Sequence, residues 1–164
     1  KEGKWTYANY LDSSLGVGNY IMDEKDGVWT WWNKNGQKEG EETFKDGELN
    51  GAYTWWHENG QKKEEGTYQD GEEDGKRTHW YKNGQKKEEG TYKGGKKEGK
   101  WTMWDKDGKM KCEGIYKKSK EWNGTFQVRH KSEFLFSYTY SIETYKDGEL
   151  IESKKRDRDG NLIE

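Results

Sequence analysis

Hydrophobic and polar residues alternate along most of this chain, and glycines interrupt the alternation at regular intervals. Threonine and aromatic residues recur at every second position, as in the segment from Gly75 to Gly84. A period of two predicts β-strands of about seven residues. Frequent glycine argues against helix. Asn-Gly, as at Asn83-Gly84, is the strongest short-range signal for a β-hairpin.

The alternating pattern repeats every 24 residues. Leading glycines stand 24 positions apart at Gly3, Gly27, Gly51, Gly75 and Gly99. Four units read Gly-x-x-Thr-x-Trp, and three of these continue to Asn-Gly; a second half carries Tyr68, Tyr92 or Tyr116. Each unit predicts two strands joined at Asn-Gly, with a looser turn such as residues 70–74 leading to the next unit. We therefore divide the chain into residues 1–123, five hairpin repeats starting near 3, 27, 51, 75 and 99, and residues 124–164, a divergent C-terminal β cap of three to five strands.

The Asn-Gly turn allows two registers, which place different residues on the same face. A two-residue loop pairs Trp80 with Lys87, whereas a three-residue loop with Gly84 left-handed pairs Trp80 with Lys86. A difference of one residue moves side chains to the other face. Both registers remain open, and we favour the three-residue loop.

The favoured register places Thr78, Trp80, Gly90 and Tyr92 on one face. These positions vary least between units, and the glycine would leave room for a ring above it. We therefore expect Trp56, Trp80 and Trp104 to be more buried than the residues immediately before them. The predicted structural residues are Trp32, Trp56, Trp80, Trp104, Tyr68, Tyr92 and Tyr116.

Composition limits the kind of core. Only 27% of residues are hydrophobic and 38% are charged, values typical of disordered chains, but aromatic residues reach 15%, with 10 Trp and 11 Tyr. A core of aliphatic residues cannot be built, so the core must be thin and aromatic. The prediction is an all-β fold, an elongated single-layer antiparallel sheet of repeated hairpins that stabilise one another by stacking.

Charge and cysteine content exclude several function classes. The formal net charge is −2, from 30 basic and 32 acidic residues, so we expect no nucleic-acid partner. No apolar run is long enough for a transmembrane helix. The single cysteine, Cys112, excludes a disulfide framework and a multi-cysteine metal site. The chain is expected to be soluble; its compartment stays open, and a cell-surface or periplasmic location would follow if an N-terminal signal had been removed.

The repeat motif resembles a known family. Gly-x-Trp-Thr-x-Trp-x-x-Asn-Gly-Gln-Lys, followed by Glu-Gly-Thr-Tyr-x-Asp-Gly, is similar to the MORN repeat variant of bacterial proteins, some of which are labelled antitoxins. The resemblance covers about residues 3–124. It implies an elongated antiparallel sheet, contacts with proteins or membrane surfaces, and no active site.

The sequence indicates binding rather than catalysis. His57, His79 and His130 have no catalytic partners at suitable spacing, and we expect no enzyme activity, cofactor or metal. The face opposite the structural residues varies along the array, and it changes abruptly to Arg77 and His79 after two units with four large rings. A purely structural face has less reason to change in this way. The candidate partner-binding residues are Trp29, Trp31, Tyr53, Trp55, His79 and Trp101.

Two interpretations of this aromatic face stay open. The rings can pack on one another, or under Lys and Arg stems, to shield a sheet without a second layer. Alternatively, they form a contact surface for another protein, with protein–protein interaction or scaffolding as the function. A module that binds glycans or cell walls through its rings is the alternative. Unpaired sheet edges also suggest end-to-end self-association.

Overall fold

The computed structural model describes residues 3–9, 14–131, 138–157, 159 and 161–163. The strands are β1 (Gly3–Asn9), β2 (Ser14–Ile21), β3 (Glu24–Trp32), β4 (Lys38–Lys45), β5 (Glu48–Trp56), β6 (Lys62–Gln69), β7 (Glu72–Glu73), β8 (Gly75–Trp80), β9 (Lys86–Lys93), β10 (Lys96–Trp104), β11 (Met110–Lys117), β12 (Lys120–Lys131), β13 (Tyr138–Lys146) and β14 (Glu149–Arg156).

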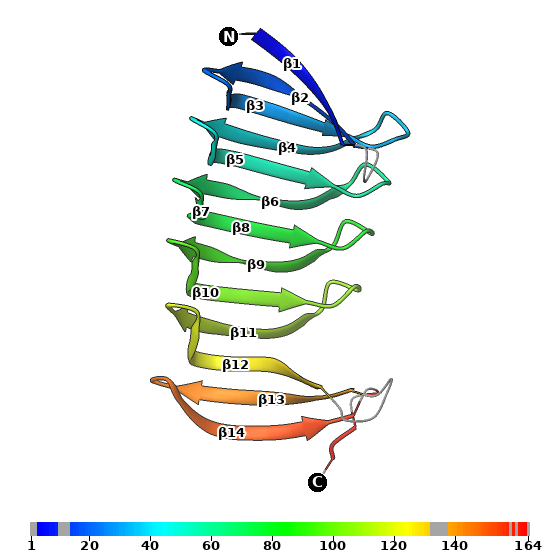
Figure 1. The fold of residues 1–164 in the computed structure, drawn as a ribbon. Helices are drawn as coiled ribbons and strands as arrows, with labels where there is room; N and C mark the ends of the chain where they lie inside the picture. Colours follow the sequence, from blue (N-terminus) through cyan, green and yellow to red (C-terminus); the bar gives the residue numbers. More distant parts are fainter. Residues whose placement is uncertain (1–2, 10–13, 132–137, 158, 160, 164) are drawn as a thin grey trace.

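The described strands form one open antiparallel sheet. Thirteen of them are hydrogen-bonded in chain order from β1 to β14, and the short β7 pairs only with β6. The result is a ladder that advances from the N-terminal to the C-terminal end of the chain (Figure 1). The predicted all-β, single-layer array of hairpins is confirmed.

The Asn-Gly turns have the three-residue loop that we favoured. Tyr81 N donates to Gln85 O at 2.9 Å, and Gly84 N donates to Tyr81 O at 2.9 Å. Gly84 has a φ of 82°, a left-handed conformation that glycine adopts without strain. Trp80 pairs with Lys86, as that loop requires.

The faces, however, differ from our prediction, because a second bulge follows at once. The register shifts between His79 and Trp80, so that Lys87 is passed over and Arg77 lies opposite Gly90. The extra residue of the loop shifts the register by one position, and the extra residue of the bulge shifts it back. Gly90 and Tyr92 therefore share a face with Arg77 and not with Trp80.

The core lies on the face that we expected to be variable. This ring face carries a buried aromatic residue in most repeats: Trp29 is 0% exposed, Trp101 2%, Tyr53 4% and Phe126 4%. The residues expected to be structural are less buried. Of these, Tyr116 is buried, while the others are half-buried, namely Trp32, Trp56, Trp80, Trp104, Tyr68 and Tyr92. The residues preceding three of them, Trp55, His79 and Met103, are half-buried too.

Strand glycines make room for these rings, as predicted, although the rings come from other positions. A Cβ added at Gly90 would lie 2.1 Å from the Trp101 ring, and one at Gly114 would lie 2.1 Å from Phe126. Trp29, Trp101 and Phe126 each lie on a glycine of the preceding strand. The rings then meet edge to face, as in the pairs Trp101–Tyr116 at 6.2 Å and Tyr116–Phe126 at 5.0 Å between centroids. A row of rings thus replaces the second layer.

The turns between repeats are tighter than predicted. Instead of a loose segment over residues 70–74, Asp70 and Gly71 form a two-residue turn with φ values of 50° and 79°. Positive φ at both central residues is typical of a type I′ turn, which suits the twist of the flanking strands. Gly71 N donates to Leu49 O at 2.9 Å, so the turn also bonds to the preceding repeat.

The C-terminal segment continues the repeat geometry. Phe126 pairs with Glu143 and Gly124 with Tyr145. The same pattern occurs one repeat earlier, where Trp101 pairs with Gly114 and Gly99 with Tyr116. In the described part of residues 124–164, β12 to β14 continue the antiparallel pairing of the array. The division at residue 124 into repeats and a divergent cap stays a prediction.

Candidate functional site

Two half-buried tryptophans form a platform at the N-terminal part of the ring face. Trp31 pairs with Gly16, and Trp55 pairs with Gly40. A Cβ added at Gly16 would lie 2.5 Å from the Trp31 ring, and one at Gly40 would lie 2.7 Å from Trp55. Both rings therefore lie on glycine in the neighbouring strand while part of each stays exposed. We call Trp31 and Trp55 the aromatic platform.

A carboxylate holds the first platform ring. Trp31 Nε1 donates to Glu42 Oε2 at 2.9 Å. Burial raises the pKa of Glu42, and the hydrogen bond from Trp31 and the nearby charge of Lys25 act in the opposite direction. Glu42 thus orients Trp31 at an electrostatic cost.

A half-buried lysine completes this part of the site. Lys25 Nζ lies 4.7 Å from the ring centroids of Trp29, Trp31 and Phe44. Burial lowers the pKa of Lys25, and the charge of Glu42 opposes this effect. Three rings around one ammonium group form a cation–π cage. Because the chain's own lysine fills the cage, a quaternary ammonium ligand would have to displace Lys25.

The Glu42→Gln variant is expected to be more stable than the wild type near neutral pH, with the advantage shrinking as the pH falls. The raised pKa means that the folded chain binds this proton more tightly than the unfolded chain. The wild type therefore gains stability relative to the variant as the pH falls through the folded pKa toward the unfolded value of about 4.3. Urea unfolding of both proteins from about pH 8 to about pH 4 measures this. A stability difference that does not vary with pH would contradict the account.

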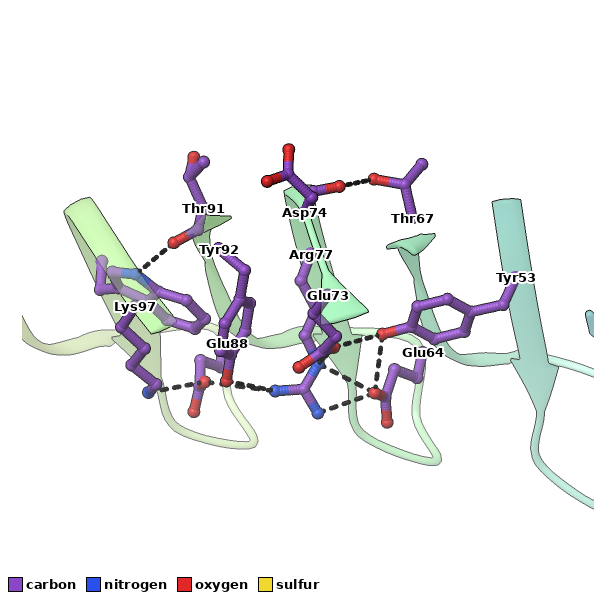
Figure 2. Close-up of polar contacts among 11 residues, drawn as sticks. Tyr53, Glu64, Thr67, Glu73, Asp74, Arg77, Glu88, Thr91, Tyr92 and Lys97 are labelled. Atoms are coloured by element: carbon purple, nitrogen blue, oxygen red, sulfur yellow. Dashed lines mark hydrogen bonds and ion pairs between the residues drawn. The ribbon is translucent and has the colours of Figure 1, made fainter. Parts of the chain in front are cut away.

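A polar network occupies the middle of the ring face (Figure 2). Tyr53 Oη lies 2.9 Å from Glu73 Oε1 and 3.1 Å from Glu64 Oε1. Arg77 donates to Glu64 from Nε at 2.8 Å and forms an ion pair with Glu73 at 3.4 Å. Burial and these carboxylates raise the pKa of the Tyr53 hydroxyl. The Arg77 guanidinium thus neutralises two carboxylates from neighbouring strands.

The network continues toward the C-terminal repeats. Arg77 Nη1 donates to Tyr92 Oη at 3.3 Å and lies 3.9 Å from Glu88. Glu88 accepts from Lys97 Nζ at 3.1 Å, and Lys97 lies 3.9 Å from the centroid of the Trp101 ring. Charges of alternating sign therefore connect Tyr53 with Lys97 along one face (Figure 2).

Packing explains why an arginine replaces the ring in the fourth repeat. Glu42 occupies the position at which other repeats have glycine, so Tyr53 cannot lie on the preceding strand. It lies on the following one, where a Cβ at Gly66 would be 2.8 Å from the Tyr53 ring. Gly66 is then unavailable to a ring at position 77. The abrupt change from Tyr53 to Arg77, which we interpreted as a functional signal, has this structural cause.

The predicted binding residues fall into two groups. Trp29, Tyr53 and Trp101 are buried at 0%, 4% and 2% exposure, so the prediction that these three form a contact surface is wrong. Their rings are covered by neighbouring side chains and seated on strand glycines. Trp31, Trp55 and His79 are half-buried and lie in one row, because they occupy the same position in successive repeats.

Sequence reasoning missed the charged residues of the site. The sequence does contain a signal, in the residue four positions before each ring. Lys25 precedes Trp29, and Lys97 precedes Trp101, whereas Glu73 precedes Arg77. Where the later position holds a ring, the earlier position holds a lysine, and Lys97 lies against the Trp101 ring. Where the later position holds Arg77, the earlier position holds Glu73, and the two form an ion pair.

Two other kinds of site are absent from the part of the chain that the structure describes. Across the described ranges, no group of three or more His, Cys, Asp or Glu residues is arranged to hold a metal ion. The same residues contain no helix that is long and apolar enough to cross a membrane.

Comparison with known proteins identifies the repeat. A family model described as MORN repeat variant matches residues 25–46, 49–70, 73–93 and 97–118, which together make up more than half of the chain. Each matched segment begins two residues before a leading glycine and ends at or near the turn between repeats. No curated protein matches the chain.

Proposed function

Because the chain belongs to the MORN repeat variant family, whose repeats are generally non-catalytic binding modules, we propose that it binds another protein through the aromatic platform. The observation that supports this is the seating of Trp31 and Trp55. Their rings lie on Gly16 and Gly40 and stay partly exposed, whereas Trp29 and Trp101 are fully covered.

The platform has the properties of a preformed anchor. Trp31 is fixed by the hydrogen bond to Glu42 and by contact with Gly16, so little conformational freedom is lost when a partner covers it. Large aromatic side chains at the centre of an interface can each contribute about 2 kcal/mol or more. The platform is therefore suited to receive apolar side chains of a partner.

The proposal predicts that the platform variants lose a partner while retaining the fold. We expect the Trp31→Ala/Trp55→Ala double variant to bind the partner captured from the native source at least about tenfold more weakly than the wild type. Met103→Ala occupies the same repeat position outside the platform and is the matched control. Far-UV circular dichroism checks the fold of each variant. Equal binding by the double variant and the control would show that the platform is not the site.

Binding of a glycan is the second candidate function. A ring that lies flat on a sheet has the geometry to stack on a sugar ring, and Trp31 and Trp55 both lie in this way. Co-sedimentation of the full chain with insoluble cell-wall polysaccharide, compared with the double variant, separates the two candidates. Sedimentation that requires both tryptophans would favour the glycan over a protein.

A further inference from the structure

A basic pocket lies at the hairpin-loop edge beside the platform row. Its volume is about 370 Å³, within the range of ligand-binding pockets. The lining includes Lys82, Lys87 and Lys106 together with His57, His79 and Tyr81, and it includes no carboxylate. Of these residues, His79 also continues the row of Trp31 and Trp55 by one repeat.

We propose that this pocket binds a carboxylate from an acidic segment of the protein partner. The inference rests on the proposed function and identifies the chemistry of the partner beyond the platform. Since His79 belongs both to the row and to the pocket, a segment that crosses Trp55 toward the next repeat would bring its following residues to the lysines.

The walls of the pocket are fixed by contacts between repeats. His57 Nε2 lies 3.1 Å from Trp80 O, and Tyr81 Oη donates to Trp104 O at 2.9 Å. Asn83 Nδ2 donates to Lys106 O at 2.6 Å. These bonds join successive hairpin loops, so the shape of the pocket does not depend on a ligand.

Two of the three ammonium groups, by contrast, are available, and the third has only an exposed partner. Lys82 lies 3.7 Å from Glu58, and both side chains are largely exposed, at 73% and 87%. Lys87 Nζ lies 5.9 Å from the Tyr81 ring centroid. Among the described residues, neither Lys87 nor Lys106 has a carboxylate within ion-pair distance. A carboxylate entering the pocket would meet cations that are not already neutralised at short range.

The acidic residues nearest to His79 are already paired with cations of the ring face. Glu64 and Glu88 lie opposite His79 in the two neighbouring strands. Glu64 accepts from Arg77, and Glu88 accepts from Lys97. These carboxylates therefore leave the lysines of the pocket without a counter-charge of their own.

Corresponding positions in other repeats lack this combination. The counterpart of Lys82 one repeat earlier is Glu58. The counterparts of Tyr81 and Asn83 one repeat later are Asp105 and Asp107. The unbroken basic lining is thus specific to this place in the array, which argues against a general property of solvated repeat surfaces.

The test is an NMR titration of the full chain with acetyl-Glu-Glu-Glu-Glu-amide, the matched Gln peptide and inorganic phosphate. We expect the Glu peptide, and not the Gln peptide, to shift the His79 ring signals in a saturable way. Lys87→Ala/Lys106→Ala should weaken this binding about fivefold or more. Lys63→Ala/Lys34→Ala removes lysines from the same two repeat positions outside the pocket and should leave binding unchanged.

Several results would overturn the proposal. These are the absence of a shift at millimolar Glu peptide, equal losses in the pocket and control variants, or tighter binding of phosphate than of the peptide, which would indicate a site for small anions. The Trp31→Ala/Trp55→Ala variant should bind the Glu peptide normally. Failure of the platform and failure of the pocket can therefore be distinguished.

Discussion

Trp101→Ala is expected to lower the free energy of unfolding by about 3–5 kcal/mol. Trp101 is 2% exposed, lies on Gly90 and meets the rings of Tyr92 and Tyr116 edge to face. In a sheet without a second layer, no other element can close the space that the ring leaves. Urea unfolding followed by far-UV circular dichroism measures the loss.

A half-buried tryptophan in the same strand provides the control. Trp104→Ala removes the same group from the opposite face and should cost clearly less, because its ring is already partly exposed. If Trp104→Ala costs as much as Trp101→Ala, the core does not lie on the ring face.

The contact between Trp101 and Gly90 can be tested by a double-mutant cycle. Gly90→Ala alone should cost about 1–3 kcal/mol, because the new methyl group would overlap a buried ring. In the Trp101→Ala background the same change should cost little, since the ring is gone. Additive effects of the two substitutions would contradict the seating of Trp101 on Gly90.

The repeat and its turns could be predicted from the sequence because their signals are local. Glycine spacing fixed the period, and Asn83-Gly84 indicated a loop whose left-handed glycine the structure contains. The faces could not be predicted, because the bulge at Lys87 reverses the effect of the loop. A bulge of this kind is set by the pairing of whole strands, and the residue type at that position does not predict it.

The candidate site was predictable in part for a related reason. Trp31 and Trp55 were identified by their aromatic character, which is visible in the sequence. The burial of Trp29 and Trp101 was not, because it depends on glycines of neighbouring strands and therefore on the register. The presence of Arg77 could not be explained from the sequence either, because it depends on two contacts. Glu42 keeps Tyr53 off the preceding strand, and Tyr53 then lies on Gly66. Only the structure shows which strand each ring contacts.

Arg77→Ala is expected to lower the free energy of unfolding by about 2–3 kcal/mol. Breaking a fully buried ion pair costs roughly 3–5 kcal/mol. We expect less here because the side chains of Arg77 and Glu64 are each about a fifth exposed. The substitution leaves Glu64 and Glu73 without their guanidinium partner on a crowded face. Urea unfolding again provides the measurement. Lys100→Ala is the control: it breaks the exposed pair of Lys100 with Glu113 and should cost about 0–1 kcal/mol.

A second substitution separates the loss of attraction from the stranding of a charge. If Arg77→Ala is destabilising because Glu64 is left uncompensated, adding Glu64→Gln should recover part of the loss, since the neutral amide can still accept from Tyr53. If the double variant is instead less stable than Arg77→Ala alone, the carboxylate of Glu64 contributes through contacts other than its pair with Arg77. An uncompensated charge on Glu64 would then not explain the cost of Arg77→Ala.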